Sequence, residues 1–277
     1  MKLIRAVSCW GNEARPAEAL SLAMEWGFEA VEGPMPADAR GFGRAVRDEG
    51  KQAIAEIATG CEEGYYVPDL WASPEDHLED FRRKLDRALE AQPLKITTLA
   101  GSDLWDFASS RKFLEQLLAI ARQAGATVSV ETHRARPTFH PLQTLGLLEE
   151  LPELSLTLDV SHWCVVCERL MARELALMAP IEARVAHIHA RIGYDQGPQV
   201  PDPRAPRYGE ALAAHLACWR RVAGHLQSKD AGVLTITPEF GPDGYLLSHP
   251  STDEPVADLR ELNRWMGAHF VECGFLV

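Results

Sequence analysis

The chain has 277 residues, of which 46% are hydrophobic and 25% are charged. These proportions are typical of a soluble globular protein and exclude a disordered chain or a fibrous repeat. A net charge of −12 argues against nucleic acid as a partner, and no apolar run approaches the roughly 18 residues needed to span a bilayer.

Short β-branched segments alternate with amphipathic segments along the whole sequence, which is the pattern of βα units around a parallel sheet. We expect eight strands, at residues 3–9, 28–32, 52–58, 94–99, 127–131, 155–159, 185–189 and 233–237. Helical spacing of apolar residues is found at 17–26, 74–91, 110–124, 142–150, 172–178, 210–227 and 255–271. The residues Ser73-Pro74-Glu75-Asp76 have the composition of a helix start.

The connections differ in length on the two sides of the predicted strands. Segments 59–72, 192–207 and 240–254 follow strands three, seven and eight, and they are long and rich in Pro, Gly and aromatic residues. This is typical of a barrel with its site at the carboxyl ends of the strands. We find no linker or change of composition, so residues 1–277 are expected to form one (β/α)₈ TIM barrel, which is favoured over a doubly wound α/β sheet.

Four consecutive predicted strands end in, or are followed two residues later by, a residue that can bind a metal, namely Glu131, Asp159, His189 and Glu239. The ends of neighbouring barrel strands converge, and three crowded carboxylates would repel one another without a cation. We therefore predict one divalent ion. Oxygen-rich ligation favours Mn²⁺ or Mg²⁺, while Co²⁺ and Zn²⁺ stay open. In the alternative interpretation the acids form an ion network with Arg191, Arg204 and Arg207.

The motif Glu131, Asp159-x-x-His162, His187-x-His189 and Glu239 resembles the xylose isomerase-like superfamily of sugar and sugar phosphate isomerases and epimerases. The resemblance implies that Glu131, Asp159, His189 and Glu239 bind the metal. It also implies that Glu131 and Glu239 are the catalytic acid/base pair and that His162 binds a substrate oxygen. The reaction implied is removal of a proton next to a carbonyl, with the metal stabilising the enediolate.

Other residues near the strand ends are candidates for binding a small carbohydrate substrate. Arg191 is suited to a carboxylate or phosphate, and His133 or Glu56 is a candidate base that does not itself bind the metal. Trp10, Trp163, Tyr194 and Tyr245 could stack on a sugar, although packing is the simpler role for each. His187 is expected to be a core histidine or a support for its neighbour His189.

Two departures from the family pattern bear on the substrate. Arg191 follows His189 by two residues, whereas in ketose epimerases the arginine lies further on, so the substrate is expected to differ. Strands three and four end without histidine, which argues against the related DNA-repair endonucleases. A dehydratase using the same site stays open, as does a non-catalytic sugar-binding barrel. Six scattered cysteines are typical of a reducing, cytoplasmic protein, and a homo-oligomer stays open.

Overall fold

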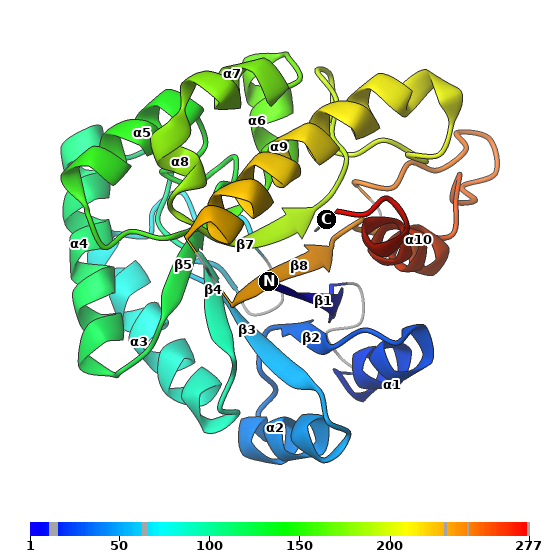
Figure 1. Ribbon diagram of the computed structural model, residues 1–277. Helices are drawn as coiled ribbons and strands as arrows, with labels where there is room; N and C mark the ends of the chain where they lie inside the picture. Colours follow the sequence, from blue (N-terminus) through cyan, green and yellow to red (C-terminus); the bar gives the residue numbers. More distant parts are fainter. Residues whose placement is uncertain (11–15, 63–65, 230–231, 243, 276–277) are drawn as a thin grey trace.

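In the residues that the structure describes, eight parallel strands close into a barrel in chain order, and β8 pairs back to β1 (Figure 1). The computed structural model describes residues 1–10, 16–62, 66–229, 232–242 and 244–275. The strands are β1 (Lys2–Ser8), β2 (Ala30–Gly33), β3 (Gln52–Ala58), β4 (Lys95–Leu99), β5 (Val128–Glu131), β6 (Leu156–Leu158), β7 (Val185–Ala190) and β8 (Val233–Pro238). All eight predicted strands are confirmed, and so is the single (β/α)₈ barrel.

Helices follow the strands and surround the barrel (Figure 1). They are α1 (Pro16–Trp26), α2 (Ala39–Asp48), α3 (Pro74–Glu90), α4 (Phe107–Gln123), α5 (Pro141–Glu150), α6 (Val160–Cys167), α7 (Ala172–Leu177), α8 (Ala179–Glu182), α9 (Gly209–Ser228) and α10 (Leu259–Glu272), with a 3₁₀ turn at Pro206–Tyr208. Within the described residues, no helix is both long and apolar enough to cross a membrane.

Three of the described helices, α2, α6 and the four-residue α8, were not among the expected segments, and α10 begins later than expected. The α2 sequence has few apolar residues, and α6 is too short to show a helical period. Helix α10 begins at Leu259, four residues after the predicted start, because Pro255 forms a β-bridge with Ser248. The predicted start of α3 is confirmed, since the Ser73 hydroxyl accepts a hydrogen bond from the Asp76 amide.

The interior of the barrel is apolar on one side and polar on the other. Ile4, Ala6, Ala30 and Ile54, from β1, β2 and β3, form a buried cluster. Opposite them, the Thr157 hydroxyl lies 2.7 Å from the hydroxyls of both Thr97 and Ser129. Side chains alternate along a strand, so the residues two positions further on also face inward. This alternation places acids and imidazoles above the core, at the carboxyl ends of the strands.

Candidate metal centre

Three of the four predicted ligands converge on one point at the carboxyl end of the barrel. Nδ1 of His189 lies 3.3 Å from Oε1 of Glu131 and 3.2 Å from Oε2 of Glu239. All three side chains are buried. Glu131 ends β5, His189 lies in β7 and Glu239 directly follows β8, so the strand ends bring together residues that lie far apart in the sequence. One ligand atom from each lies within 4.8 Å of the others, which is close enough to hold a metal ion.

Asp159 lies beside this group and shares Glu131 with it. It is the N-cap of α6, where its Oδ1 accepts a hydrogen bond from the Ser161 amide at 2.8 Å. Asp159, Glu131 and His162 form a second group of potential ligand atoms within 4.8 Å. Nε2 of His162 lies 3.5 Å from Oδ2 of Asp159 and 4.0 Å from Oε1 of Glu131.

Arg191 is the main charged partner of Asp159. Its Nη2 donates to Oδ2 of Asp159 and, at 2.8 Å, to Nε2 of His162, while its Nε donates to the Ser161 hydroxyl at 3.1 Å. Its Nη1 also lies 3.8 Å from Oε2 of Glu239. The guanidinium of Arg191 is buried, so this residue is not a mobile charge on the surface.

The predicted ion network is therefore present only in part. Arg191 pairs with two of the acids, as that alternative required. Arg204 instead pairs with Asp202 at 2.8 Å and with Glu261, and the guanidinium of Arg207 lies over the ring of Tyr208. Arg191 alone supplies less charge than Glu131, Asp159 and Glu239 carry together.

The electrostatics of the site favour a cation. Burial raises the pKa of Glu131 to about 7, with Glu239 and Asp159 adding to the effect, and burial also raises the pKa of Asp159 despite the nearby Arg191. Burial alone would lower the pKa of His189, but the carboxylates of Glu239 and Glu131 outweigh it and raise this pKa well above its usual value.

Two buried polar atoms at the point of convergence lack a hydrogen-bond partner among the described residues. They are Nδ1 of His189 and Oε2 of Glu239, and they face each other. Unpartnered buried polar atoms are rare because each costs about 1–3 kcal/mol. A divalent cation would satisfy both atoms and offset the repulsion among the acids. The residues therefore fit a hard or borderline divalent ion.

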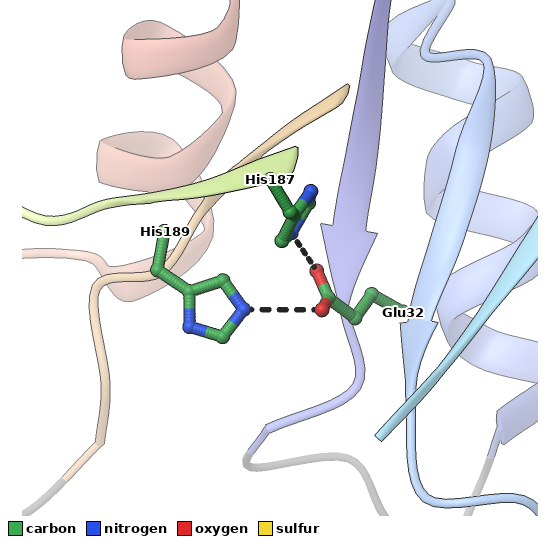
Figure 2. Close-up of side chains that lie close together, drawn as sticks. All are labelled: Glu32, His187 and His189. Carbon is green, nitrogen blue, oxygen red and sulfur yellow. Dashed lines mark hydrogen bonds and ion pairs between the residues drawn. The ribbon is translucent and has the colours of Figure 1, made fainter. Parts of the chain in front are cut away.

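Glu32 is a member of the site that sequence reasoning missed. It lies near the end of β2, where its Oε1 is 3.0 Å from Nε2 of His189 and its Oε2 is 3.0 Å from Nε2 of His187 (Figure 2). The predicted strand 28–32 ends in Glu32. An acidic residue at the end of a strand is the signal by which the candidate ligands were identified, and it could have identified Glu32 as well. His187 is buried and its Nδ1 pairs with the Thr235 hydroxyl at 2.7 Å, as predicted for a core histidine.

A cavity opens above the converging ligands. Most of the predicted substrate-binding residues line it, together with the two carboxylates predicted to be catalytic; these are Trp10, Glu56, Glu131, His133, Arg191 and Glu239. Tyr66 and Tyr245 are also in its wall, and it extends to Glu62, Lys84 and Arg87. His162 is not in the wall but lies against His133, with ring centroids 3.9 Å apart.

The aromatic candidates divide into two groups. Trp10 and Tyr245 pack edge to face at 4.9 Å, and the guanidinium of Arg191 lies 4.5 Å from the Tyr245 ring centre. Trp163 is instead fully buried, where its Nε1 donates to the Thr138 carbonyl, and Tyr194 packs against Tyr208. Stacking on a substrate is therefore wrong for Trp163, and neither it nor Tyr194 belongs to the cavity wall.

Three titratable groups in the cavity wall or directly behind it have strongly shifted pKa values. Burial, together with the charges of Glu239, Glu32 and Glu131, raises the pKa of Glu56 well above its usual value. Burial and nearby arginines lower the pKa of His133 well below its usual value, and burial with the neighbouring His133 does the same for His162. A carboxyl group with a raised pKa and a weakly basic imidazole, those of Glu56 and His133, thus line the same cavity.

Comparisons with known proteins identify the family to which the fold belongs. The model of a family described as xylose isomerase-like TIM barrel matches residues 20–266. No curated protein matches the sequence significantly. Similar solved structures include D-psicose 3-epimerase with D-fructose, at 12% identity over 96% of this chain and 98% of that chain, with a TM-score of 0.63.

Two other similar structures carry different activities in their names. The probable 3-DHS dehydratase AsbF involved in petrobactin synthesis from Bacillus anthracis is 16% identical over 97% of this chain and 98% of that chain, with a TM-score of 0.62. AP endonuclease, family 2, from Brucella melitensis is 19% identical over 88% of this chain and 94% of that chain, with a TM-score of 0.60. At such identities the likeness shows the fold alone, so the reaction has to be argued from the site.

Proposed function

Because the chain belongs to the family of xylose isomerase-like TIM barrels, we propose that it is a divalent-metal-dependent isomerase or epimerase of a small sugar, sugar acid or sugar phosphate. The observation that carries this proposal is the convergence of Nδ1 of His189 with carboxylate oxygens of Glu131 and Glu239, at 3.3 and 3.2 Å, below an open cavity.

In this proposal Glu131, Asp159, His189 and Glu239 hold the ion, and Mn²⁺ or Mg²⁺ suits three carboxylates and one imidazole. A bound ion would supply Lewis-acid stabilisation of the negative charge that develops on substrate oxygens when the neighbouring carbon loses its proton. Oδ2 of Asp159 now accepts from Arg191, so this oxygen has to serve both partners or exchange one for the other.

Glu131 and Glu239 are the residues that we propose to move the proton. They project into one cavity from β5 and from the end of β8, so a substrate between them would meet a carboxylate on each side. One carboxylate removes the proton next to the carbonyl and the other returns it. Return to the other face gives epimerisation, and return to the neighbouring carbon gives isomerisation.

Side chains in the cavity wall are suited to recognise the substrate. Arg191 offers a buried guanidinium suited to a carboxylate or phosphate oxygen, and its contacts with Ser161 and His162 hold it in place. Trp10 and Tyr245 present apolar surface beside it, which suits the carbon face of a sugar. His133 lies in the same wall and His162 directly behind it. A small polar anion or polyol is thus a better fit than a nucleic acid.

A second reaction, loss of water by a metal-dependent dehydratase, is favoured by one observation. Glu56 lines the cavity, and burial is the main cause that raises its pKa well above the usual value, which favours the neutral carboxyl group. Expulsion of a hydroxyl group as water needs a proton donor, and a neutral carboxyl group meets that need. The same initial loss of a proton precedes both reactions, so Glu56 is the residue on which the choice would depend.

The test is incubation of the Mn²⁺-loaded protein in D₂O with a panel of ketoses, sugar acids and sugar phosphates. Deuterium entering recovered or isomerised substrate supports the isomerase or epimerase, and loss of water to a dicarbonyl product supports the dehydratase. Glu131→Gln should abolish either signal. Glu182→Gln is the matched control, because it makes the same change at a buried acid that pairs with Arg221 in the outer helices. No deuterium uptake and no product from any substrate would overturn both proposals.

We also propose a cytoplasmic location. The six cysteines are scattered along the sequence without the density or spacing of a disulfide framework, and this supports a reducing compartment.

A further inference from the structure

Glu32 is fully engaged although it belongs to none of the predicted ligand positions. Its side chain is 1% exposed, and both carboxylate oxygens have partners. Oε1 faces Nε2 of His189 at 3.0 Å. Oε2 faces Nε2 of His187, also at 3.0 Å, and accepts a hydrogen bond from the Thr237 hydroxyl. The carboxylate is therefore fixed by residues of β7 and β8 as well as by its own strand, β2.

A histidine that binds a metal has to be neutral, and in the neutral ring of His189 the contact with Glu32 determines which nitrogen carries the proton. A carboxylate can only accept hydrogen bonds, so the Nε2 that faces Glu32 has to be the donor. In the neutral ring, Nδ1 then keeps its lone pair, and this is the atom that lies between Glu131 and Glu239. The lone pair is thus directed at the point where the carboxylates converge.

The contact with His187 prevents the carboxylate from turning away. His187 lies two residues before His189 on β7, so both imidazoles reach toward Glu32 from the same strand, as Figure 2 shows. The Thr235 hydroxyl holds the other ring nitrogen of His187 at 2.7 Å. A line of contacts therefore runs from Thr235 through His187 and Glu32 to His189.

We propose that Glu32 is a positioning residue that fixes the ring of His189 with Nδ1 toward Glu131 and Glu239, and thereby sets the affinity of the site for a divalent cation. This inference rests on the metal site of the proposed function. The negative charge of Glu32 has a second effect. A carboxylate that accepts a hydrogen bond from Nε2 makes the Nδ1 lone pair more basic, so Nδ1 binds a metal more strongly. Loss of such a supporting group typically weakens metal binding about 10- to 100-fold.

The test compares variants of the full chain by calorimetric titration with Mn²⁺ after removal of bound metal. Glu32→Gln keeps the size of the side chain but removes its charge, and it should weaken binding about 10- to 100-fold. Thr237→Val removes one donor to Glu32 and should weaken binding by a smaller factor. Glu182→Gln, the matched change in the outer helices, should leave the dissociation constant within about twofold of the native value, as expected for a buried acid with no contact to the site.

A second readout separates positioning from general damage to the fold. The visible absorption spectrum of bound Co²⁺ depends on the ligand atoms and their geometry, and we expect it to change in Glu32→Gln but not in Glu182→Gln. Circular dichroism and the melting temperature of the metal-free proteins show whether each variant is folded. If Glu32→Gln does not fold, Thr237→Val decides, because it leaves the carboxylate in place.

The outcomes distinguish this inference from the proposed function. Folded Glu32→Gln that binds Mn²⁺ as tightly as the native chain, with an unchanged Co²⁺ spectrum, overturns the role of Glu32 alone. Native protein that binds no divalent ion overturns the metal site and the role of Glu32 together. Weak binding by Glu32→Gln, alongside native protein that binds Mn²⁺ but exchanges no deuterium, supports the role of Glu32 and contradicts the proposed reaction.

Discussion

Nδ1 of His189 lies 3.2 Å from Oε2 of Glu239, and neither buried atom has a hydrogen-bond partner among the described residues. Two such atoms facing each other are unfavourable unless a proton or a metal lies between them. A proton would make the pair a simple ion pair, whereas a metal would also engage Glu131, whose Oε1 is 3.3 Å from the same nitrogen. The two cases lead to different results when Glu239 is changed.

Replacing Glu239 with glutamine should remove tight metal binding. The substitution keeps the shape of the side chain and replaces a charged ligand with a neutral amide, which is a poorer ligand for a divalent ion. We expect the dissociation constant for Mn²⁺ to rise by more than the roughly 10- to 100-fold typical of supporting groups. Calorimetry on native and variant protein measures it. Equal affinity would show that Glu239 is not a ligand.

Replacing Arg191 with glutamine should weaken binding of anionic substrates selectively. A hydrogen bond to a charged group contributes about 1.5–3 kcal/mol, which corresponds to roughly a 10- to 150-fold rise in KM. Arg191 also donates to Asp159, so KM has to be measured at saturating Mn²⁺. A neutral ketose is the control substrate and should be affected much less. The assignment is wrong if sugar acids and neutral ketoses lose affinity equally.

The stability of the fold should decrease in mild acid partly because of His215. Burial lowers the pKa of this residue to about 4, and the charge of Arg191 adds to the effect, although the hydrogen bond from Nδ1 to the Ala211 carbonyl opposes it. Its Nε2 accepts from the Gly193 amide, which requires the neutral ring. The unfolded chain, with the usual histidine pKa of about 6.5, then binds the proton more tightly than the folded chain. The free energy of unfolding should therefore fall as pH decreases from about 6.5 toward 4.

The slope from this one group approaches about 1.4 kcal/mol per pH unit inside that window and vanishes above it. Urea unfolding of native protein and of His215→Gln at several pH values measures the difference. The variant is less stable at neutral pH, because it loses a buried contact, but its stability should fall less steeply between pH 6 and 4.5. Parallel curves for the two proteins would contradict a neutral buried His215.

The capping box of α3 provides a test of the fold that is independent of the site. Ser73 accepts from the Asp76 amide at 3.2 Å, and Asp76 accepts from the Ser73 amide at 2.8 Å. Ser73→Ala removes the first of these bonds and should lower the free energy of unfolding by about 0.5–2 kcal/mol. Chemical denaturation measures the change, and metal affinity should remain as in the native chain. Ser73→Thr, which keeps the hydroxyl, should retain most of the stability.

Local patterns in the sequence were sufficient to predict the barrel and to propose candidate ligands at one end of it. Strand positions follow from β-branched segments with helical segments between them, and this periodicity is set by the backbone within each segment. Glu131, Asp159, His189 and Glu239 were candidates because each ends a predicted strand or follows one within two residues, and parallel strands of a barrel end at one mouth. Helix α2 was missed because it has few apolar residues, although Ala39, Phe42 and Val46 recur at helical spacing.

Contacts among these side chains depended on the tertiary structure. Asp159 pairs with Arg191, whose guanidinium lies over the rings of Trp10 and Tyr245, and no local pattern in the sequence predicts these contacts. Glu32 joins His189 across 157 positions of sequence, and no local pattern carries that pairing. The sequence by itself determined which groups stand at the mouth of the barrel. The closed barrel decided which of them touch, because its curvature brings β2, β7 and β8 around a common interior.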